Sequence, residues 1–152
     1  MKTITCANLF TIPITEKEAY VVTTNGMTKK DGAAVMGAGI AKNAAMLFPS
    51  LPVLLGRSLR RHGNQAFAYR VNDRNSHPYN VITMPTKQDW HNPSDIELIK
   101  ASCAQMVEIA DLNGFTRVYM PKPGCRNGGL DWESQVKPVI SQILDDRFVV
   151  AL

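Results

Sequence analysis

The chain has 152 residues, of which 45% are hydrophobic and 20% charged, a composition that is ordinary for one soluble globular domain. It contains no run of about 20 apolar residues, the length that a membrane-spanning helix needs, and its first residues lack the apolar core of a signal peptide. We therefore expect a single domain over residues 1–152 with no membrane partner. The formal charge of +4 is compatible with a phosphate-bearing partner without identifying one.

Strand and helix signals alternate along the chain. β-branched and aromatic residues predict six strands, at residues 2–6, 19–24, 66–71, 80–85, 116–120 and 147–151. Helical patterns predict four helices, at about 39–48, 50–62, 94–112 and 131–144. Alternating elements with short connections favour an α/β fold, a three-layer α/β/α sandwich.

Local signals set the ends of the predicted helices. Pro49 disfavours a helical conformation of the residue before it, and Gly63 is typical of a helix end. In the third helix, Ser94 and Glu97 form an S-x-x-E capping box, and Asn113-Gly114 marks the end. One face of that helix is apolar: Ile96, Ile99, Cys103, Met106, Val107 and Ala110.

Cysteines and histidines are spread along the chain: Cys6, His62, His77, His91, Cys103 and Cys125. The cysteines form no CxxC pair, and the histidines have no metal-ligand spacing. We therefore expect reduced thiols in a cytoplasmic protein, with no structural metal and no cofactor. We also expect the domain to act as a monomer.

Two glycine-containing loops follow predicted strands and precede predicted helices. Because open α/β sheets bind ligands beyond the carboxyl ends of their strands, these loops are candidate sites. In the first loop, Gly37-Ala38-Gly39 could bring backbone N–H groups to an anion, but a plain helix-entry turn is equally compatible. The dinucleotide fingerprint is excluded because Lys42 stands where its third glycine belongs, and the Walker pattern is absent.

The second loop, residues 121–132, carries three glycines within six residues. A single loop of this kind is compatible with a flexible connection. Two such loops at strand ends favour a ligand that contains a diphosphate.

Several other residues have both a purely structural and a functional interpretation. Lys87 follows a central strand and could have a role there, but most lysines in proteins are simply solvated. Asp131 at a helix start is typical of an N-cap rather than a catalyst, and Trp132 of helix packing rather than base stacking. Three arginines at helical spacing indicate a solvated helix face rather than a nucleic-acid contact: Arg57, Arg60 and Arg61.

Four strings in this order resemble the macro domain family: Asn-Leu-Phe at 8–10, Val-Met-Gly-Ala-Gly-Ile-Ala at 35–41, Pro-Thr-Lys at 85–87 and Gly-Cys-x-x-Gly-Gly-Leu-Asp-Trp at 124–132. The chain looks closest to the branch of the DNA ADP-ribosyl glycohydrolase antitoxins and the human terminal ADP-ribose protein glycohydrolase. The resemblance extends from Asn8 to about Val139. It implies a mixed six-stranded sheet between helices, with ADP-ribose in a cleft at the crest of the sheet.

Carried over by position, the resemblance implies a role for each matching residue. The residues beside the adenine are Asn8 and Leu9, and the residue near the distal ribose is Asn25. The distal ribose and one phosphate are wrapped by Gly37, Ala38, Gly39, Ile40 and Ala41. The diphosphate is cradled by Gly124, Cys125, Arg126, Asn127, Gly128, Gly129 and Leu130.

Lys87 matches the lysine that is proposed to act at the anomeric carbon of the distal ribose in this branch. An uncharged lysine amine can serve as a nucleophile there. The resemblance thus implies a hydrolase that removes ADP-ribose from a nucleic-acid base or a protein carboxylate. Two alternatives stay open, a phosphatase acting on ADP-ribose 1''-phosphate and a non-catalytic reader or sequestering module for ADP-ribose.

The sequence departs from the pattern at several positions. Many family members have aspartate where Asn8 stands. The human enzyme has a partner aspartate where this chain has Gly128, and Asp131 lies three residues further on, so the carboxylate role does not transfer to it. The segment 26–34 is longer than in the relatives, and its polar residues indicate an exposed turn rather than a device that reshapes substrate access.

Overall fold

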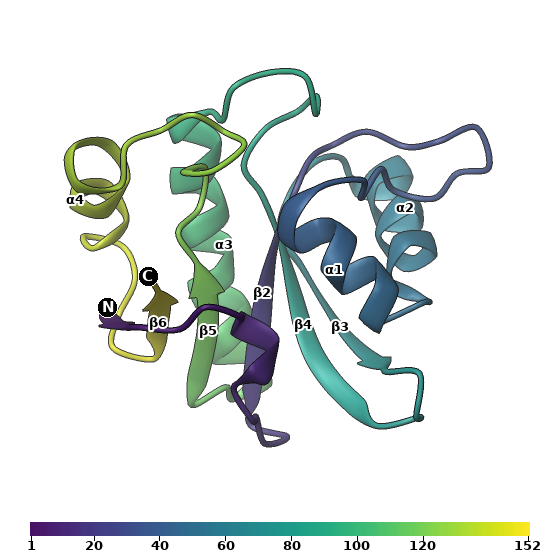
Figure 1. Ribbon diagram of the computed structural model, residues 1–152, viewed down its shortest axis with the longest axis horizontal. Coiled ribbons are helices and arrows are strands. Elements are labelled where there is room, and N and C mark those ends of the chain that lie inside the picture. The colour runs from purple at the N-terminus through teal and green to yellow at the C-terminus, as the bar shows by residue number, and fades with distance from the viewer.

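Six strands and four helices make up the protein in the computed structural model, which describes residues 1–152 (Figure 1). The strands are β1 (Lys2–Ile4), β2 (Glu18–Thr24), β3 (Phe67–Asn72), β4 (Pro78–Pro85), β5 (Arg117–Pro121) and β6 (Phe148–Ala151). The helices are α1 (Gly39–Leu47), α2 (Leu51–His62), α3 (Ile96–Asn113) and α4 (Lys137–Ile140). A 3₁₀ turn spans Leu9–Thr11, and a π-helical turn spans Trp132–Val136.

The strands form one sheet in the order β1-β6-β5-β2-β4-β3. All neighbours are parallel except β3 and β4, which are antiparallel, so the predicted mixed six-stranded sheet is confirmed. β2 lies between β5 and β4, and all three run in the same direction. Their carboxyl ends therefore meet at the middle of one edge of the sheet, at the top of Figure 1.

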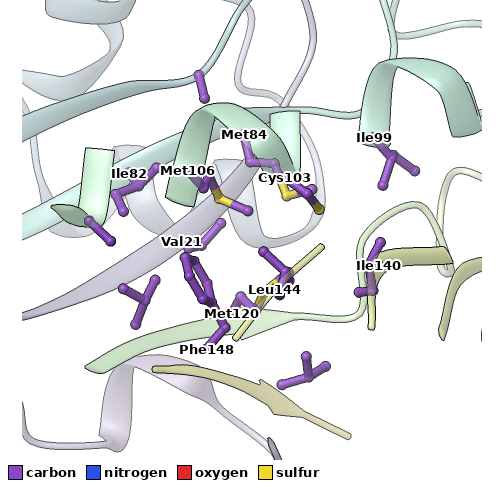
Figure 2. Close-up of a cluster of buried hydrophobic side chains, with 14 of the residues drawn as sticks. Val21, Ile82, Met84, Ile99, Cys103, Met106, Met120, Ile140, Leu144 and Phe148 are labelled. Atoms are coloured by element: carbon purple, nitrogen blue, oxygen red, sulfur yellow. The ribbon is translucent and has the colours of Figure 1, made fainter. Parts of the chain in front are cut away.

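One face of the sheet packs against α3 and α4. Val21, Ile82 and Met120 project from neighbouring strands onto Met106 of α3 and Ile140 of α4, and all five side chains are completely buried (Figure 2). The full burial of one such aliphatic side chain stabilises the fold by about 1.5–3 kcal/mol. The apolar face predicted for residues 94–112 is the face that α3 buries here.

The opposite face of the sheet packs against α1 and α2. Because side chains alternate along a strand, Tyr20 and Val22 point away from Val21 and contact the cluster that contains Ala44 and Leu55. Helices on both faces confirm the three-layer sandwich. No single helix is long and apolar enough to cross a membrane; α1 and α2 reach that standard only when joined across a bend of 117°.

The structure corrects the predicted start of α3. Asp95, not Ser94, is the N-cap, and its Oδ1 accepts hydrogen bonds from the backbone N–H groups of Glu97 at 2.9 Å and Leu98 at 3.4 Å. The Ser94 N–H instead donates to the Gly128 carbonyl at 3.0 Å, which holds this residue in the site described below. The ends predicted at Pro49, Gly63 and Asn113-Gly114 are confirmed, since Gly63 and Gly114 are C-caps with positive φ.

The helix predicted for 131–144 is shorter and irregular. It starts at Asp131 with a π-helical turn, in which the Val136 N–H reaches back to the Asp131 carbonyl, and α4 then covers only Lys137–Ile140. Pro138 explains why a regular α-helix does not run through this segment, because proline has no N–H to donate to the carbonyl four residues back. Trp132 is buried in the core, and Asp131 caps the turn by accepting hydrogen bonds from Ser134. The interpretations of Trp132 as a packing residue and of Asp131 as an N-cap are therefore confirmed.

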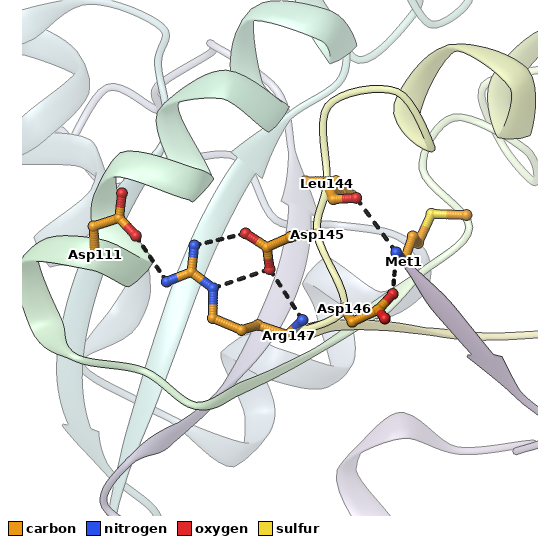
Figure 3. Close-up of polar contacts among 6 residues, drawn as sticks. All are labelled: Met1, Asp111, Leu144, Asp145, Asp146 and Arg147. Atoms are coloured by element: carbon orange, nitrogen blue, oxygen red, sulfur yellow. Dashed lines mark hydrogen bonds and ion pairs between the residues drawn. The ribbon is translucent and has the colours of Figure 1, made fainter.

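The first residue of the chain contacts a polar cluster at the start of the paired strands β1 and β6 (Figure 3). The Met1 amino group donates to Asp146 Oδ1 at 2.9 Å and to the Leu144 carbonyl at 3.3 Å. Arg147 donates from Nε and Nη2 to the two carboxylate oxygens of Asp145, and its Nη1 lies 2.8 Å from Asp111. These contacts hold the pKa of Asp145 below its usual value and raise that of Arg147.

We expect Asp145→Asn to lower the free energy of unfolding at pH 7 by about 1 kcal/mol or less, because the pair is partly exposed. Since the lowered pKa belongs to the folded state, the stabilisation is present above the usual carboxyl pKa near 3.8 and is lost as the pH falls through the lowered folded value. Urea unfolding at pH 7 and at acid pH measures this difference. Glu108→Gln on exposed α3 surface is the control; an equal loss in both variants, or a loss that persists in acid, contradicts the prediction.

Candidate functional site

A cleft of about 920 Å³ lies at the carboxyl ends of β2, β4 and β5. Thr24 ends β2, Lys87 follows β4, and Lys122 follows β5, and all three line this cleft. Its volume suits a small organic ligand or nucleotide, since ligand pockets commonly have about 300–1,000 Å³. The three loops that the sequence singled out therefore meet at one site, as expected from the parallel strands that they follow.

The structure brings almost all of the predicted site residues into this cleft. The lining includes Lys87, Asn8, Leu9, Asn25, Gly37, Ala38, Gly39, Ile40, Ala41, Gly124, Cys125, Arg126, Asn127 and Gly128. Gly129 and Leu130 lie outside it. They shape the loop instead, because Gly129 has a φ of +76° and the Leu130 N–H closes the loop by donating to the Gly124 carbonyl at 2.9 Å.

The first glycine loop delivers the start of α1 to the cleft. Gly39 has a φ of +57°, a conformation that favours glycine. Ala38 is the N-cap and offers no side-chain acceptor, so no side chain satisfies the first N–H groups of this nine-residue helix. Those N–H groups and the helix dipole together favour an anion at this end of the cleft.

The second glycine loop is packed tightly against the residues before α3. A Cβ atom on Gly128 would lie 2.0 Å from Ser94 Oγ and 2.6 Å from the Gly124 carbonyl oxygen. Ser94 is only 8% exposed, and its hydroxyl makes no hydrogen bond within the protein. Position 128 therefore has no room for the aspartate of the human enzyme, and the backbone of this loop is brought close to the cleft wall.

Lys87 connects the central loop to the second glycine loop. Its half-buried side chain extends so that Nζ donates to the Asn127 carbonyl at 3.4 Å. The backbone around it is fixed, since the Thr86 N–H donates to Thr24 and Asn64 Nδ2 donates to the Lys87 carbonyl. The structure thus holds the amine at the cleft rather than in open solvent.

The charges around the cleft have one sign. Lys87, Lys122 and Arg126 are its charged side chains, and no aspartate or glutamate side chain lines it. Asp131 does not line the cleft. Its carboxylate instead caps the π-helical turn by accepting hydrogen bonds from the N–H and the hydroxyl of Ser134. This arrangement favours an anionic ligand and leaves Lys87 without a carboxylate partner among the lining residues.

Burial disfavours one of the two thiols that reach the cleft as a nucleophile. The three cysteines are free, and Cys6 and Cys125 reach the cleft while Cys103 lies in the core. Burial raises the pKa of Cys125, and it raises the pKa of Cys103 to about 12. Because the thiolate is the reactive form, Cys125 is disfavoured as a nucleophile.

Two asparagines of the cleft have their amide groups partly engaged within the protein. Asn8 Oδ1 accepts from the Phe10 N–H at 3.1 Å and caps the 3₁₀ turn, which leaves its NH₂ group unengaged. Asn25 donates to the Val35 carbonyl and accepts from the Met27 N–H, so it holds the base of the 26–34 segment. That segment is a hairpin whose tip, residues 29–31, is exposed, whereas Ala34 at its end is buried; none of the residues 26–34 lines the cleft.

The three arginines that were interpreted as a solvated helix face are exposed on α2. Arg60 uses its guanidinium to hold the hairpin by donating to the Gly32 carbonyl. None of the three arginines, Arg57, Arg60 and Arg61, lines the cleft. Arg60 and Arg61 lie in the last turn of α2, where positive charge interacts favourably with the helix dipole.

The structure adds lining residues that sequence reasoning missed, chiefly Trp90, Ser94, Lys122 and Asn43. Trp90 is 54% exposed although it is the most hydrophobic residue of its loop. Ser94 was interpreted as a helix cap, and Lys122 lies in the second glycine loop but outside the residues to which the family resemblance assigns a role. A second, more open depression of about 750 Å³ shares Lys87 and Ser94 with the cleft and also includes Asn92 and Leu130.

Comparisons with known proteins bear on this fold and cleft. No protein-family model matches the chain. The DNA ADP-ribosyl glycohydrolase of Thermus aquaticus is 30% identical over 141 residues, which are 91% of this chain and 36% of that relative. The macrodomain of Mycobacterium tuberculosis DarG has a TM-score of 0.79 at 27% identity and covers 99% of this chain and 97% of that domain. The structure of Thermosipho africanus DarTG in complex with ADP-ribose has a TM-score of 0.72 at 24% identity, covering 88% of this chain and 37% of that one.

The fold is that of a macro domain. The chain is homologous to the DarG DNA ADP-ribosyl glycohydrolases, at about 28% identity over most of its length. The family resemblance inferred from the four strings is thereby confirmed. The chain spans 32% to 36% of the length of the curated relatives that it matches, so the correspondence concerns one part of those proteins.

Proposed function

We propose that this macro domain binds ADP-ribose in the cleft and releases it from a modified nucleic acid or protein by hydrolysis at the distal ribose. The observation that carries the proposal is the meeting of Lys87 with two glycine-containing loops in one cleft. The homology to DNA ADP-ribosyl glycohydrolases supports the reaction class.

Binding of ADP-ribose is supported by the charge and the backbone of the cleft. The start of α1 and the loop around Gly124 and Gly128 face the same space, so two sets of N–H groups are available to one diphosphate. Lys122 and Arg126 add positive charge without a competing carboxylate. The related Thermosipho africanus DarTG has been solved in complex with ADP-ribose.

The chemistry is assigned to the Lys87 amine. In its uncharged form, Nζ attacks the anomeric carbon of the distal ribose as the bond from that carbon to the modified group breaks, and the electron pair of that bond leaves with the group, which takes up a proton. Water then attacks the same carbon, which releases ADP-ribose and restores the lysine. The Asn127 carbonyl, 3.4 Å from Nζ, accepts a hydrogen bond from the amine and fixes its position.

A panel of three substrates tests this function. We expect the wild-type chain to release ADP-ribose from ADP-ribosylated DNA or from ADP-ribosylated protein, and to leave ADP-ribose 1''-phosphate intact, because no carboxylate in the cleft can activate a water for attack on a terminal phosphate. Mass spectrometry of each mixture identifies the product.

Each other outcome overturns a defined part of the proposal. Phosphate release alone indicates the phosphatase. Saturable ADP-ribose binding without release from any substrate indicates a reader module. The absence of ADP-ribose binding in titration calorimetry removes the ligand assignment itself.

A further inference from the structure

Four successive backbone carbonyl groups, at the exit of β4, each accept a hydrogen bond from a different part of the chain. The donor–acceptor pairs are Ser102 Oγ with Pro85 (2.8 Å), the Asp95 N–H with Thr86 (2.8 Å), Asn64 Nδ2 with Lys87 (3.1 Å) and the Gly26 N–H with Gln88 (2.8 Å). The main chain that carries Lys87 is therefore held by segments that lie far apart in the sequence.

Asn64 is the residue that donates to Lys87, and it comes from the turn between α2 and β3. Both hydrogen atoms of its Nδ2 are used, one for the Lys87 carbonyl and the other for Gln88 Oε1, each at 3.1 Å. A flip of the amide would set the Asn64 side-chain oxygen against these two acceptors. The orientation of the amide is therefore fixed.

The other end of the Asn64 amide shows that stability does not explain its presence. Its Oδ1 is buried and has no hydrogen-bond partner. A buried acceptor without a partner destabilises the folded state by an amount comparable to what one or two hydrogen bonds contribute. Asn64 therefore adds little net stability, and its contribution lies in where it holds the main chain of Lys87.

The packing around the Asn64 amide leaves no room for it to shift toward β2. A Cβ atom on Gly26 would lie 2.8 Å from Asn64 Cγ and 2.6 Å from Gln88 Nε2. Gly26 does not have a positive φ, so this position requires glycine for space rather than for conformation. A methyl group at Gly26 would push the amide away from the Lys87 carbonyl.

The position of the main chain matters because the Lys87 side chain is weakly held. Its Nζ makes a single hydrogen bond, to the Asn127 carbonyl, and the distance of 3.4 Å is long for an N–H donor. Lysine also carries its amine on a flexible four-carbon stem. Misplacement of a reacting group by about 1 Å can lower a rate by about a hundredfold. The carbonyl contact from Asn64 therefore bears directly on where the amine can reach.

We infer that Asn64 is a positioning residue for the reaction at Lys87, which it serves by holding the lysine main chain at the exit of β4. This inference rests on the proposed function and adds a residue on which turnover depends. Asn64 does not line the cleft. It acts through Lys87 rather than through contact with a ligand, so its loss affects the rate and not the binding of ADP-ribose.

Steady-state kinetics of Asn64→Ala test this inference, with whichever ADP-ribosylated DNA or protein the wild-type chain hydrolyses as the substrate. We expect kcat to fall about tenfold, while KM and the affinity for ADP-ribose change by less than about twofold. The thermal midpoint should stay close to that of the wild type. Asn64→Asp keeps the size of the side chain without the donor and should lower kcat at least as much.

Gly26→Ala tests the same contact from the other side. It keeps Asn64 but displaces the amide, and neither Gly26 nor Asn64 lines the cleft. This variant should therefore also lower kcat with little change in the affinity for ADP-ribose.

Ser102→Ala is the matched control, because it removes the other side-chain donor among the four pairs. Its hydroxyl group is completely buried, and its partner Pro85 lies within β4, where pairing with Thr24 of β2 already holds the strand. Ser102→Ala leaves a buried carbonyl unpaired. It should lower the thermal midpoint more than Asn64→Ala does, while kcat stays within about twofold of the wild-type value.

Three results would overturn the inference. They are a wild-type kcat in Asn64→Ala, an affinity for ADP-ribose that falls as much as kcat does, and an equal loss of kcat in Ser102→Ala. Each of them leaves the proposed function standing. By contrast, a wild-type chain that releases no ADP-ribose from any substrate overturns the proposed function and this inference together.

Discussion

Lys87→Ala is expected to abolish the release of ADP-ribose while the affinity for free ADP-ribose stays within about tenfold of the wild-type value, equivalent to 1.4 kcal/mol. The amine is the only nucleophile that we assign at the distal ribose, whereas the diphosphate is bound mainly by backbone groups of the two glycine loops. The variant loses the hydrogen bond from Nζ to Asn127 and one positive charge, which accounts for a modest loss of affinity. Product release followed by mass spectrometry and binding followed by calorimetry measure the two effects separately.

Two further variants distinguish a nucleophile from a positive charge at this position. Lys87→Arg keeps the charge, but the guanidinium stays protonated and cannot attack carbon. It should be as inactive as Lys87→Ala. Lys122→Ala removes a different lysine of the same cleft and should lower affinity while turnover persists. Normal turnover by Lys87→Ala or Lys87→Arg on the substrate of the wild-type chain shows that the lysine mechanism is wrong.

Much of the fold could be predicted because the signals are local. The runs that form β2 and β4 alternate between the two faces of the sheet, with Val21 and Tyr20 as one adjacent pair, so both faces need a helical cover. Gly63 and Gly114 end helices at positive φ, which glycine adopts without strain. The convergence of the three loops followed from the parallel order of β5, β2 and β4.

The failures have a different cause, namely contacts between distant parts of the chain. Ser94 and Asp95 are both good N-cap residues, and the choice between them depends on Gly128, more than 30 positions further along, whose carbonyl takes the Ser94 N–H. The Ser94 side chain and the Gly124 carbonyl also leave no room for a side chain on Gly128. No local pattern contains that information. The irregular helix at Pro138 has a local cause instead. The helical pattern of residues 131–144 predicts one continuous helix, although the proline within it disfavours one.

Part of the candidate site could likewise be predicted from the sequence and part could not. The glycine loops and Lys87 are found because their strings are specific in order and match a known family. Trp90 was not singled out, because an exposed tryptophan in a polar loop has no sequence signal that separates it from a buried one. Its exposure and its stacking on His91 are properties of the folded loop.

Gly39→Val is expected to eliminate ADP-ribose binding, with a loss of at least about a hundredfold in affinity, or 2.7 kcal/mol. Gly39 has a φ of +57°, which a β-branched residue rarely adopts, and a Cβ there would lie 3.1 Å from Asn127 Nδ2. The new side chain would both strain the start of α1 and stand between its N–H groups and the diphosphate. Titration calorimetry measures the loss, and thermal unfolding establishes that the variant is folded.

Gly37→Ala is the matched control, because it lies in the same loop and lines the same cleft. Gly37 does not have a positive φ, and a Cβ at this position meets nothing within 4 Å. The variant should therefore keep its thermal stability and most of its affinity for ADP-ribose. If a folded Gly39→Val binds ADP-ribose as tightly as the wild type does, the start of α1 is not the phosphate contact, and the ligand must be held by the loop around Gly124 alone. If Gly37→Ala loses as much affinity as Gly39→Val, close approach along the whole loop, rather than the geometry of Gly39, sets the binding energy.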